Sequence, residues 1–102
     1  MNRITKTITE ITYPDFEDRI RTVKEFASAT GRPYKVVLVD GGIVFYKQPG
    51  ATNGPRQIEL QKLYDAYTNL QNFQLAYWGQ YLPKNFSAGR SLLIRAGLLK
   101  HE

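Results

Sequence analysis

Two β-rich runs in the middle of the chain constrain its fold more than any other feature. The first run, 35–39 (KVVLV), and the second, 43–47 (IVFYK), are separated by Asp40-Gly41-Gly42. Asp-Gly supplies the positive φ angles that a tight hairpin turn requires. Both runs are apolar at nearly every position, as is typical of strands inside a sheet. No helical pattern follows the glycines, which argues against a phosphate-binding loop, so we predict an antiparallel hairpin.

A strand and a helix are expected before the hairpin. Segment 3–12 is rich in Thr and Ile, which favours a strand with one wet face. A helix is predicted from Pro14, which suits the first helical turn, to Gly31, which suits the left-handed position after the last turn. Its apolar stripe would consist of Phe16, Ile20, Val23, Phe26 and Ala27. Glu17 and Arg21 are spaced to form an ion pair on its outer face.

A long helix is expected after the hairpin, starting at Pro55. Its predicted apolar seam, spaced alternately three and four residues apart, is Leu60, Leu63, Tyr67, Leu70, Gln74, Tyr77 and Tyr81. The favoured interpretation is an amphipathic helix packed across the sheet. The alternative is a helix–helix seam of a homodimer, with Gln74 fixing the register. A short last helix, roughly Ala88–Ala96, would be capped by Ser87 and ended by Gly97.

Together these elements predict one α+β domain over residues 1–102, with the order β-α-β-β-α-α. We expect a three-stranded, mainly antiparallel sheet with the helices packed on one face. The predicted core comprises Ile8, Phe16, Ile20, Val23, Val37, Val39, Val44, Tyr46, Leu63, Tyr67, Leu70, Leu92 and Leu93.

The composition excludes several kinds of chemistry. The chain has no cysteine, and its one histidine is His101, next to the end of the sequence. Disulfides, zinc sites and catalytic triads of the usual kinds are therefore not available. The clustered carboxylates Asp15, Glu17 and Asp18 are explained by the dipole of the helix that they begin. We expect no enzyme, no metal and no cofactor; a metal-independent ribonuclease using Arg, Lys and Tyr is the enzymatic alternative.

Hydropathy gives an expectation about location. The first ten residues contain no apolar core of a signal peptide, and the longest aliphatic run, Val36–Val39, is far too short to cross a membrane. We therefore expect a cytoplasmic protein without a membrane association.

The net charge of +5 is unevenly distributed. Residues 1–65 hold ten Lys/Arg and eight Asp/Glu, whereas residues 66–101 hold four Lys/Arg and no acid. Basic side chains interleaved with aromatic rings favour an acidic partner such as a nucleic acid. The predicted contacts in this acid-free stretch are Trp78, Tyr81, Lys84, Arg90, Arg95 and Lys100.

These contacts have simpler explanations as well. Arg95 and Lys100 lie near a helix C-terminus, where the dipole favours cations, and Arg90 would simply point into water. The leading hypothesis is a small non-enzymatic protein that binds DNA or RNA, or regulates, through this C-terminal surface. The alternative is a protein-interaction module or inhibitor, homodimeric through the long helix.

Overall fold

The predicted hairpin lies at the centre of an antiparallel sheet in a computed structural model of the chain. Strands β3 (Pro33–Asp40) and β4 (Ile43–Lys47) pair around Gly41 and Gly42, which both have positive φ, as a type I′ turn requires. The sheet has the order β2-β3-β4-β5, so both hairpin strands are internal. Its edges are β2 (Glu25–Ala27) and β5 (Arg56–Glu59). The structure describes residues 4–27, 31–50, 52, 54–82 and 84–101.

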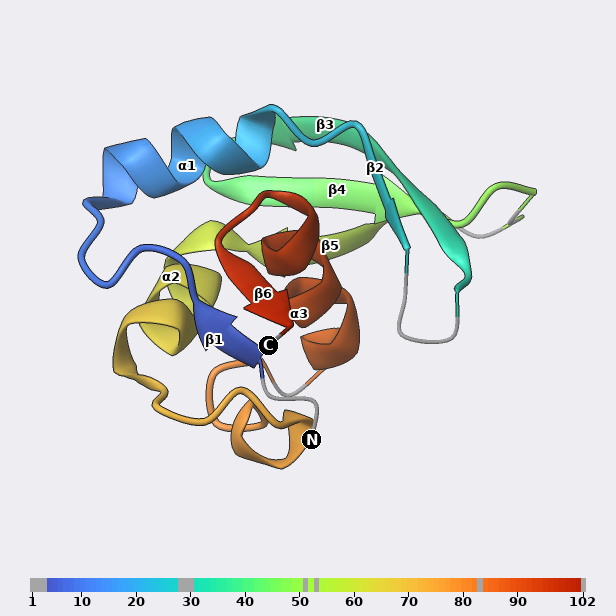
Figure 1. Cartoon of the computed structure of the whole chain (residues 1–102). Coiled ribbons are helices and arrows are strands. Elements are labelled where there is room, and N and C mark those ends of the chain that lie inside the picture. Colours follow the sequence, from blue (N-terminus) through green and yellow to red (C-terminus); the bar gives the residue numbers. More distant parts are fainter. Residues whose placement is uncertain (1–3, 28–30, 51, 53, 83, 102) are drawn as a thin grey trace.

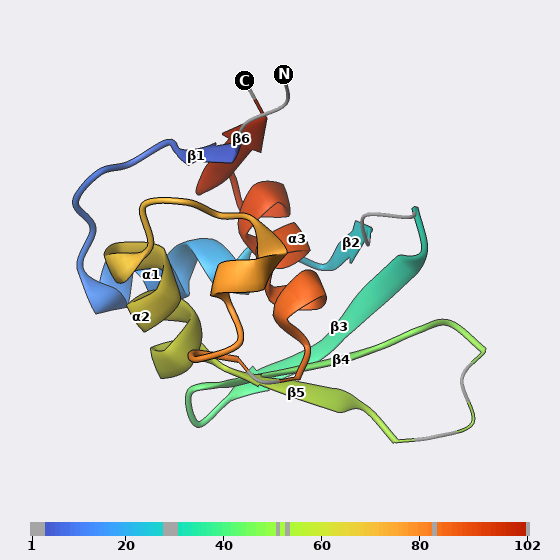
Figure 2. The same ribbon diagram turned by 90° about the horizontal axis from the view of Figure 1, so that it is seen from below.

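The helices cover one face of this sheet, as predicted for an α+β fold. They are α1 (Tyr13–Arg21), α2 (Leu60–Asn69) and α3 (Phe86–Arg95), with a short 3₁₀ turn η1 (Leu75–Tyr77) before α3. Figure 2 shows all of them on the same side of β3, β4 and β5. No described element covers the opposite side of the sheet, which we call the open face (Figure 2).

The predicted strand order and the three-stranded sheet are wrong. The N-terminal strand β1 (Ile4–Lys6) does not join the hairpin but pairs antiparallel with a strand that the sequence did not indicate, β6 (Leu99–His101). The two strands form a separate small sheet, side by side in both views (Figures 1 and 2). The two ends of the described chain therefore meet on the side of the helices that faces away from the large sheet.

The first helix begins as predicted and ends ten residues early. Thr12 is its N-cap, and the Thr12 hydroxyl accepts a hydrogen bond from the Asp15 amide at 3.4 Å. The helix stops at Arg21, because Thr22 turns its hydroxyl back onto the Arg19 carbonyl at 2.7 Å. Phe26, predicted on the helical stripe, instead lies in β2 and stacks on aromatic rings of β3 and β4. Tertiary packing has overridden a helical spacing.

The prediction of one long helix starting at Pro55 is also wrong. Residues 56–59 form the edge strand β5, and the Leu60 amide bonds to the Gly42 carbonyl at 2.8 Å where α2 begins. The helix ends at Asn69, where the side chains of Thr68 and Asn69 bond to carbonyls one turn earlier. Such bonds compete with helix continuation. The proposed homodimer seam has no helix to carry it beyond Leu70.

The last helix starts two residues earlier than expected and ends as predicted. Its N-cap is Asn85, with φ 62°, and not Ser87. At the C-terminus, Gly97 has φ 80° and its amide bonds to the Ile94 carbonyl at 3.1 Å. The Leu98 amide bonds to the Leu93 carbonyl at 2.9 Å, which completes a Schellman motif.

One hydrophobic core lies between the sheet and the helices. Most of the predicted core is buried: Phe16, Ile20, Val23, Val44, Tyr46, Leu63, Tyr67, Leu70, Leu92 and Leu93. Ile8 and Val39 are only partly buried, and Val37 is 52% exposed. Val37 is exposed because a β-bulge shifts the register of β3 between Val36 and Leu38 and so breaks the alternation of inward and outward side chains. Ile8 lies in the loop between β1 and α1.

Candidate functional site

Trp78, one of the predicted contacts, does not contact solvent. Its side chain is completely buried, and the indole N–H donates to the Phe73 carbonyl at 3.2 Å. The neighbouring Tyr77 is half exposed instead. Tyr81 is partly buried at the rim of the core. A base therefore cannot stack on Trp78 in this structure.

The predicted cations do not share one patch. Asn85, next to the exposed Lys84, bonds to the Gln57 carbonyl of β5 at 3.0 Å. Arg95 bonds to the Glu25 carbonyl of β2 at 3.3 Å. Because β5 and β2 are the two opposite edges of the sheet, Lys84 and Arg95 lie far apart. Lys100 is exposed on β6, in the other sheet.

Arg90 is an incompletely paired charge. Its Nη1 donates to the Phe73 carbonyl at 3.3 Å, the same oxygen that accepts the bond from Trp78. Its Nε is buried without a hydrogen-bond partner among the described residues. Burial lowers the pKa of the Arg90 guanidinium, and no carboxylate of the described chain forms an ion pair with it. Such a cation is stabilised by an incoming anion more than an ordinary surface arginine is.

The small sheet is held to α2 by Tyr67. The Tyr67 hydroxyl lies 2.7 Å from the Ile8 carbonyl and 3.0 Å from the Leu98 carbonyl. It can therefore donate its hydrogen bond to either of these two chain segments. Lys6, on β1, donates to the Thr68 carbonyl at 3.2 Å, and its ammonium lies 5.4 Å from the centre of the Tyr67 ring. These contacts fix Lys6 against α2, and burial lowers the pKa of its ammonium group.

A groove of about 390 Å³ opens beside this junction. It is lined by six residues, four polar and two apolar: Thr5, Lys6, Thr9, Gln71, Leu70 and Phe73. None of these six residues is acidic, so the groove offers hydrogen-bond donors and one cation without a competing carboxylate. The Phe73 carbonyl behind it is the one that Arg90 contacts.

The pairing of β1 with β6 joins the two segments of the sequence that carry the excess positive charge, although Lys84 and Arg95 lie away from this pairing. Residues 10–65 hold eight Lys/Arg and eight Asp/Glu and are neutral. Residues 1–9 hold two cations and residues 66–101 hold four, with no acid in either segment, and Glu102 subtracts one to give +5. The described parts of these two end segments, 4–9, 66–82 and 84–101, are called the acid-free side below.

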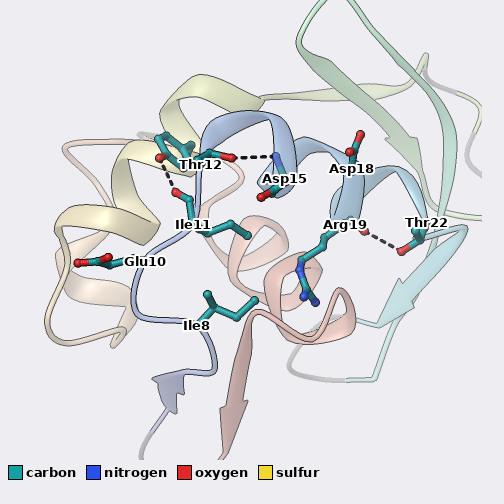
Figure 3. Close-up of a pocket in the computed structure, with 9 residues that line it drawn as sticks. Ile8, Glu10, Ile11, Thr12, Asp15, Asp18, Arg19 and Thr22 are labelled. Atoms are coloured by element: carbon teal, nitrogen blue, oxygen red, sulfur yellow. Dashed lines mark hydrogen bonds between the residues drawn. The ribbon is translucent and has the colours of Figure 1, made fainter.

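A second, larger groove of about 860 Å³ lies beside α1 (Figure 3). Its acids are Glu10, Asp15 and Asp18, and the figure shows Glu10 and Asp18 on opposite sides, pointing away from each other. The described residues contain no group of three acids or histidines close enough to hold a metal ion. The hydroxyls of this groove bond to main-chain groups, such as Tyr64 to the Ile11 carbonyl at 2.7 Å. It offers no nucleophile paired with a base.

Comparison with known protein families, curated proteins and solved structures found no match. Within the part of the chain that the structure describes, no helix has the length and apolar character needed to cross a membrane.

Sequence reasoning missed Lys6, Thr5 and Thr9 as site residues. A signal for them was present, since the first nine residues lack acids just as residues 66–101 do. The contact between the two acid-free segments could not be predicted from the sequence, because β6 is only three residues long and carries no clear strand pattern.

Proposed function

We propose that this protein is a non-enzymatic nucleic-acid-binding protein that contacts the sugar–phosphate backbone through its acid-free side. One observation carries the proposal: the two segments that hold all the excess positive charge are joined by the β1–β6 pairing. Charge that is gathered without counter-charges is the usual electrostatic basis of phosphate binding.

Three cations supply the contacts. Lys6 lines the groove, and Arg90 approaches the Phe73 carbonyl, which belongs to another residue of the groove lining. Lys100 lies opposite Thr5, one position along from Lys6, so it is exposed on the other face of the β1–β6 pair. The hydroxyl of Thr9 and the amide of Gln71 add neutral donors for phosphate or sugar oxygens. With three cations, the site is predicted to bind weakly and with little sequence preference.

The test is binding of labelled single-stranded RNA, single-stranded DNA and duplex DNA, followed by fluorescence anisotropy across a salt series. With three phosphate contacts, log K should fall against log salt with a slope of about −2 for a single strand. Lys100→Gln should make this slope shallower by about 0.7. Lys24→Gln is the matched control, because Lys24 is an exposed lysine of the neutral segment and should leave the slope unchanged.

Absence of binding to all three probes at low salt would overturn the proposal. Equal effects of Lys100→Gln and Lys24→Gln would show that binding follows net charge and not this site.

A further inference from the structure

The open face of the large sheet is unusual because its side chains are ordered by charge. The strand register places the outward-facing residues in three rows across the strands. At one end, Lys35 lies opposite Lys47, with Glu25 on the neighbouring edge strand. At the other end, Ile43 lies between Asp40 and Glu59.

The middle row is apolar. Leu38 lies opposite Phe45, and Phe45 lies opposite Gln57 on the next strand. The bulge adds Val37 to the exposed surface, and both Val37 and Leu38 are 52% exposed. Outside the core, the other large apolar side chain with comparable exposure in the described chain is Tyr77. The apolar part of the open face is therefore concentrated in its centre.

Lys47 is poorly accommodated in a single copy, because Lys35 lies opposite it, while Glu25 lies opposite Lys35 on the other neighbouring strand. Like charges directly opposite each other in an antiparallel pair are destabilising. Among the described residues neither Lys35 nor Lys47 forms an ion pair, and Asp40 forms none either. Glu59 pairs with Lys62 at 2.8 Å, but both side chains are about half exposed, so this pair is open to a further partner.

We propose that the open face binds a second copy of this chain in a two-fold dimer. Rotation by 180° about an axis along the apolar row superimposes the row of Lys35 and Lys47 on the partner's acidic row. Lys35 then faces the partner's Asp40, and Leu38 and Phe45 of both copies pack in the centre. An interface that is its own complement is what a two-fold axis requires.

A nucleic acid is a poorer occupant of this face. The outward-facing charged residues of the open face are two lysines and three acids, Glu25, Asp40 and Glu59. The open face therefore has no excess of positive charge. A polyanion would meet the acidic row wherever it follows the sheet. The dimer also leaves the β1–β6 sheet uncovered, because the helices lie between that sheet and the open face (Figure 2).

The size of the face predicts a weak dimer. Strands about 4.8 Å apart and residues about 3.3 Å apart give a patch of roughly 14 Å by 14 Å between the outermost Cα positions. This is smaller than the roughly 800 Å² per partner of a standard stable interface, so we expect a dissociation constant in the micromolar to millimolar range.

The test is sedimentation equilibrium of the full chain at low salt, from micromolar to millimolar concentration. The average mass should rise from 11.7 kDa towards twice that value. Leu38→Asp should remain monomeric. Lys35→Glu and Asp40→Lys should each weaken association by about tenfold, since each pair occurs twice. The double variant Lys35→Glu/Asp40→Lys should recover the affinity to within a few-fold.

Circular dichroism establishes that each variant is folded, and Lys24→Glu, outside the three rows, should associate like the parent. A wild-type mass that stays at the monomer value, or a dimer that Leu38→Asp leaves intact, would overturn the proposal. So would a folded double variant that does not recover. If Leu38→Asp abolished nucleic-acid binding in a chain that is monomeric throughout, the open face would be a nucleic-acid surface and not a dimer interface.

Discussion

Trp78 and Arg90 illustrate at the residue scale how position in the fold decides what a side chain does. Both belong to the acid-free stretch and were predicted as contacts. The short η1 turn places Trp78 in the core and its neighbour Tyr77 on the surface. Arg90 is drawn towards the same Phe73 carbonyl, where burial leaves its Nε without a partner among the described residues. The burial of Trp78 and the partners of Arg90 depend on residues distant in the fold and were not predictable from the local sequence.

Replacing Arg90 by Met should separate stability from binding. Met keeps much of the length of the side chain and removes a buried donor that has no partner. The free energy of unfolding in urea should therefore stay equal or rise by about 1 kcal/mol. Nucleic-acid affinity should fall at the same time, because one of the three proposed cations is lost. A loss of stability of more than about 1 kcal/mol would instead assign Arg90 a structural role.

The local elements show where sequence patterns were sufficient. The hairpin, the start of α1 at Thr12 and the end of α3 at Gly97 are each specified by residues next to one another in the chain. In contrast, α1 was predicted to continue beyond its end at Arg21. The second helix was predicted to begin before Leu60 and to continue beyond Asn69. Phe26 and Ile58 complete strands that pair with the hairpin, and that pairing depends on distant residues.

Gly97 tests the Schellman motif that precedes β6. The residue has φ 80°, and a Cβ added there would meet nothing within 4 Å, so the cost of substitution is conformational and not steric. Gly97→Ala should lower the free energy of unfolding by about 1 kcal/mol, measured by urea denaturation. Gly97→Asn should cost less, because Asn tolerates the left-handed region better. Equal stability of all three proteins would contradict this role.

At the scale of the whole molecule, the described chain forms three layers. The open face of the large sheet lies on one side, the helices form the middle, and the β1–β6 sheet lies on the other side (Figure 2). Tyr67 connects the middle layer to the small sheet, and Tyr46 lies buried between the large sheet and the helices. The integrity of all three layers therefore depends on buried tyrosines.

Alkaline pH should expose this dependence. Burial raises the pKa of Tyr46, with Arg56 opposing, and burial raises the pKa of Tyr67, with the hydrogen bond to Ile8 opposing. The folded protein thus keeps these protons above pH about 10, where the unfolded chain releases them. Their contribution to stability is complete below about pH 10 and is lost as the pH rises towards the folded pKa values. Lys6 acts in the opposite direction, since its pKa is lowered.

Each tyrosine should reduce the free energy of unfolding by about 1.4 kcal/mol per pH unit in that window. Urea unfolding at a series of pH values between about 9 and 11 measures this slope. Tyr46→Phe should make this slope shallower but not abolish it, because burial also raises the pKa of Tyr67 and of Tyr13. A slope that is unchanged by the substitution would show that Tyr46 ionises in the folded protein.

The sequence by itself determined the α+β class, the central hairpin, most of the core and the excess of positive charge near the end of the chain. These follow from short-range patterns, because turns, caps and apolar periodicity act between residues close in sequence. Only the tertiary structure decided the edge strands, the burial of Trp78 and the pairing of β1 with β6. Each of these depends on which distant surfaces exclude water together, and a short strand is stable only when its partner is in place.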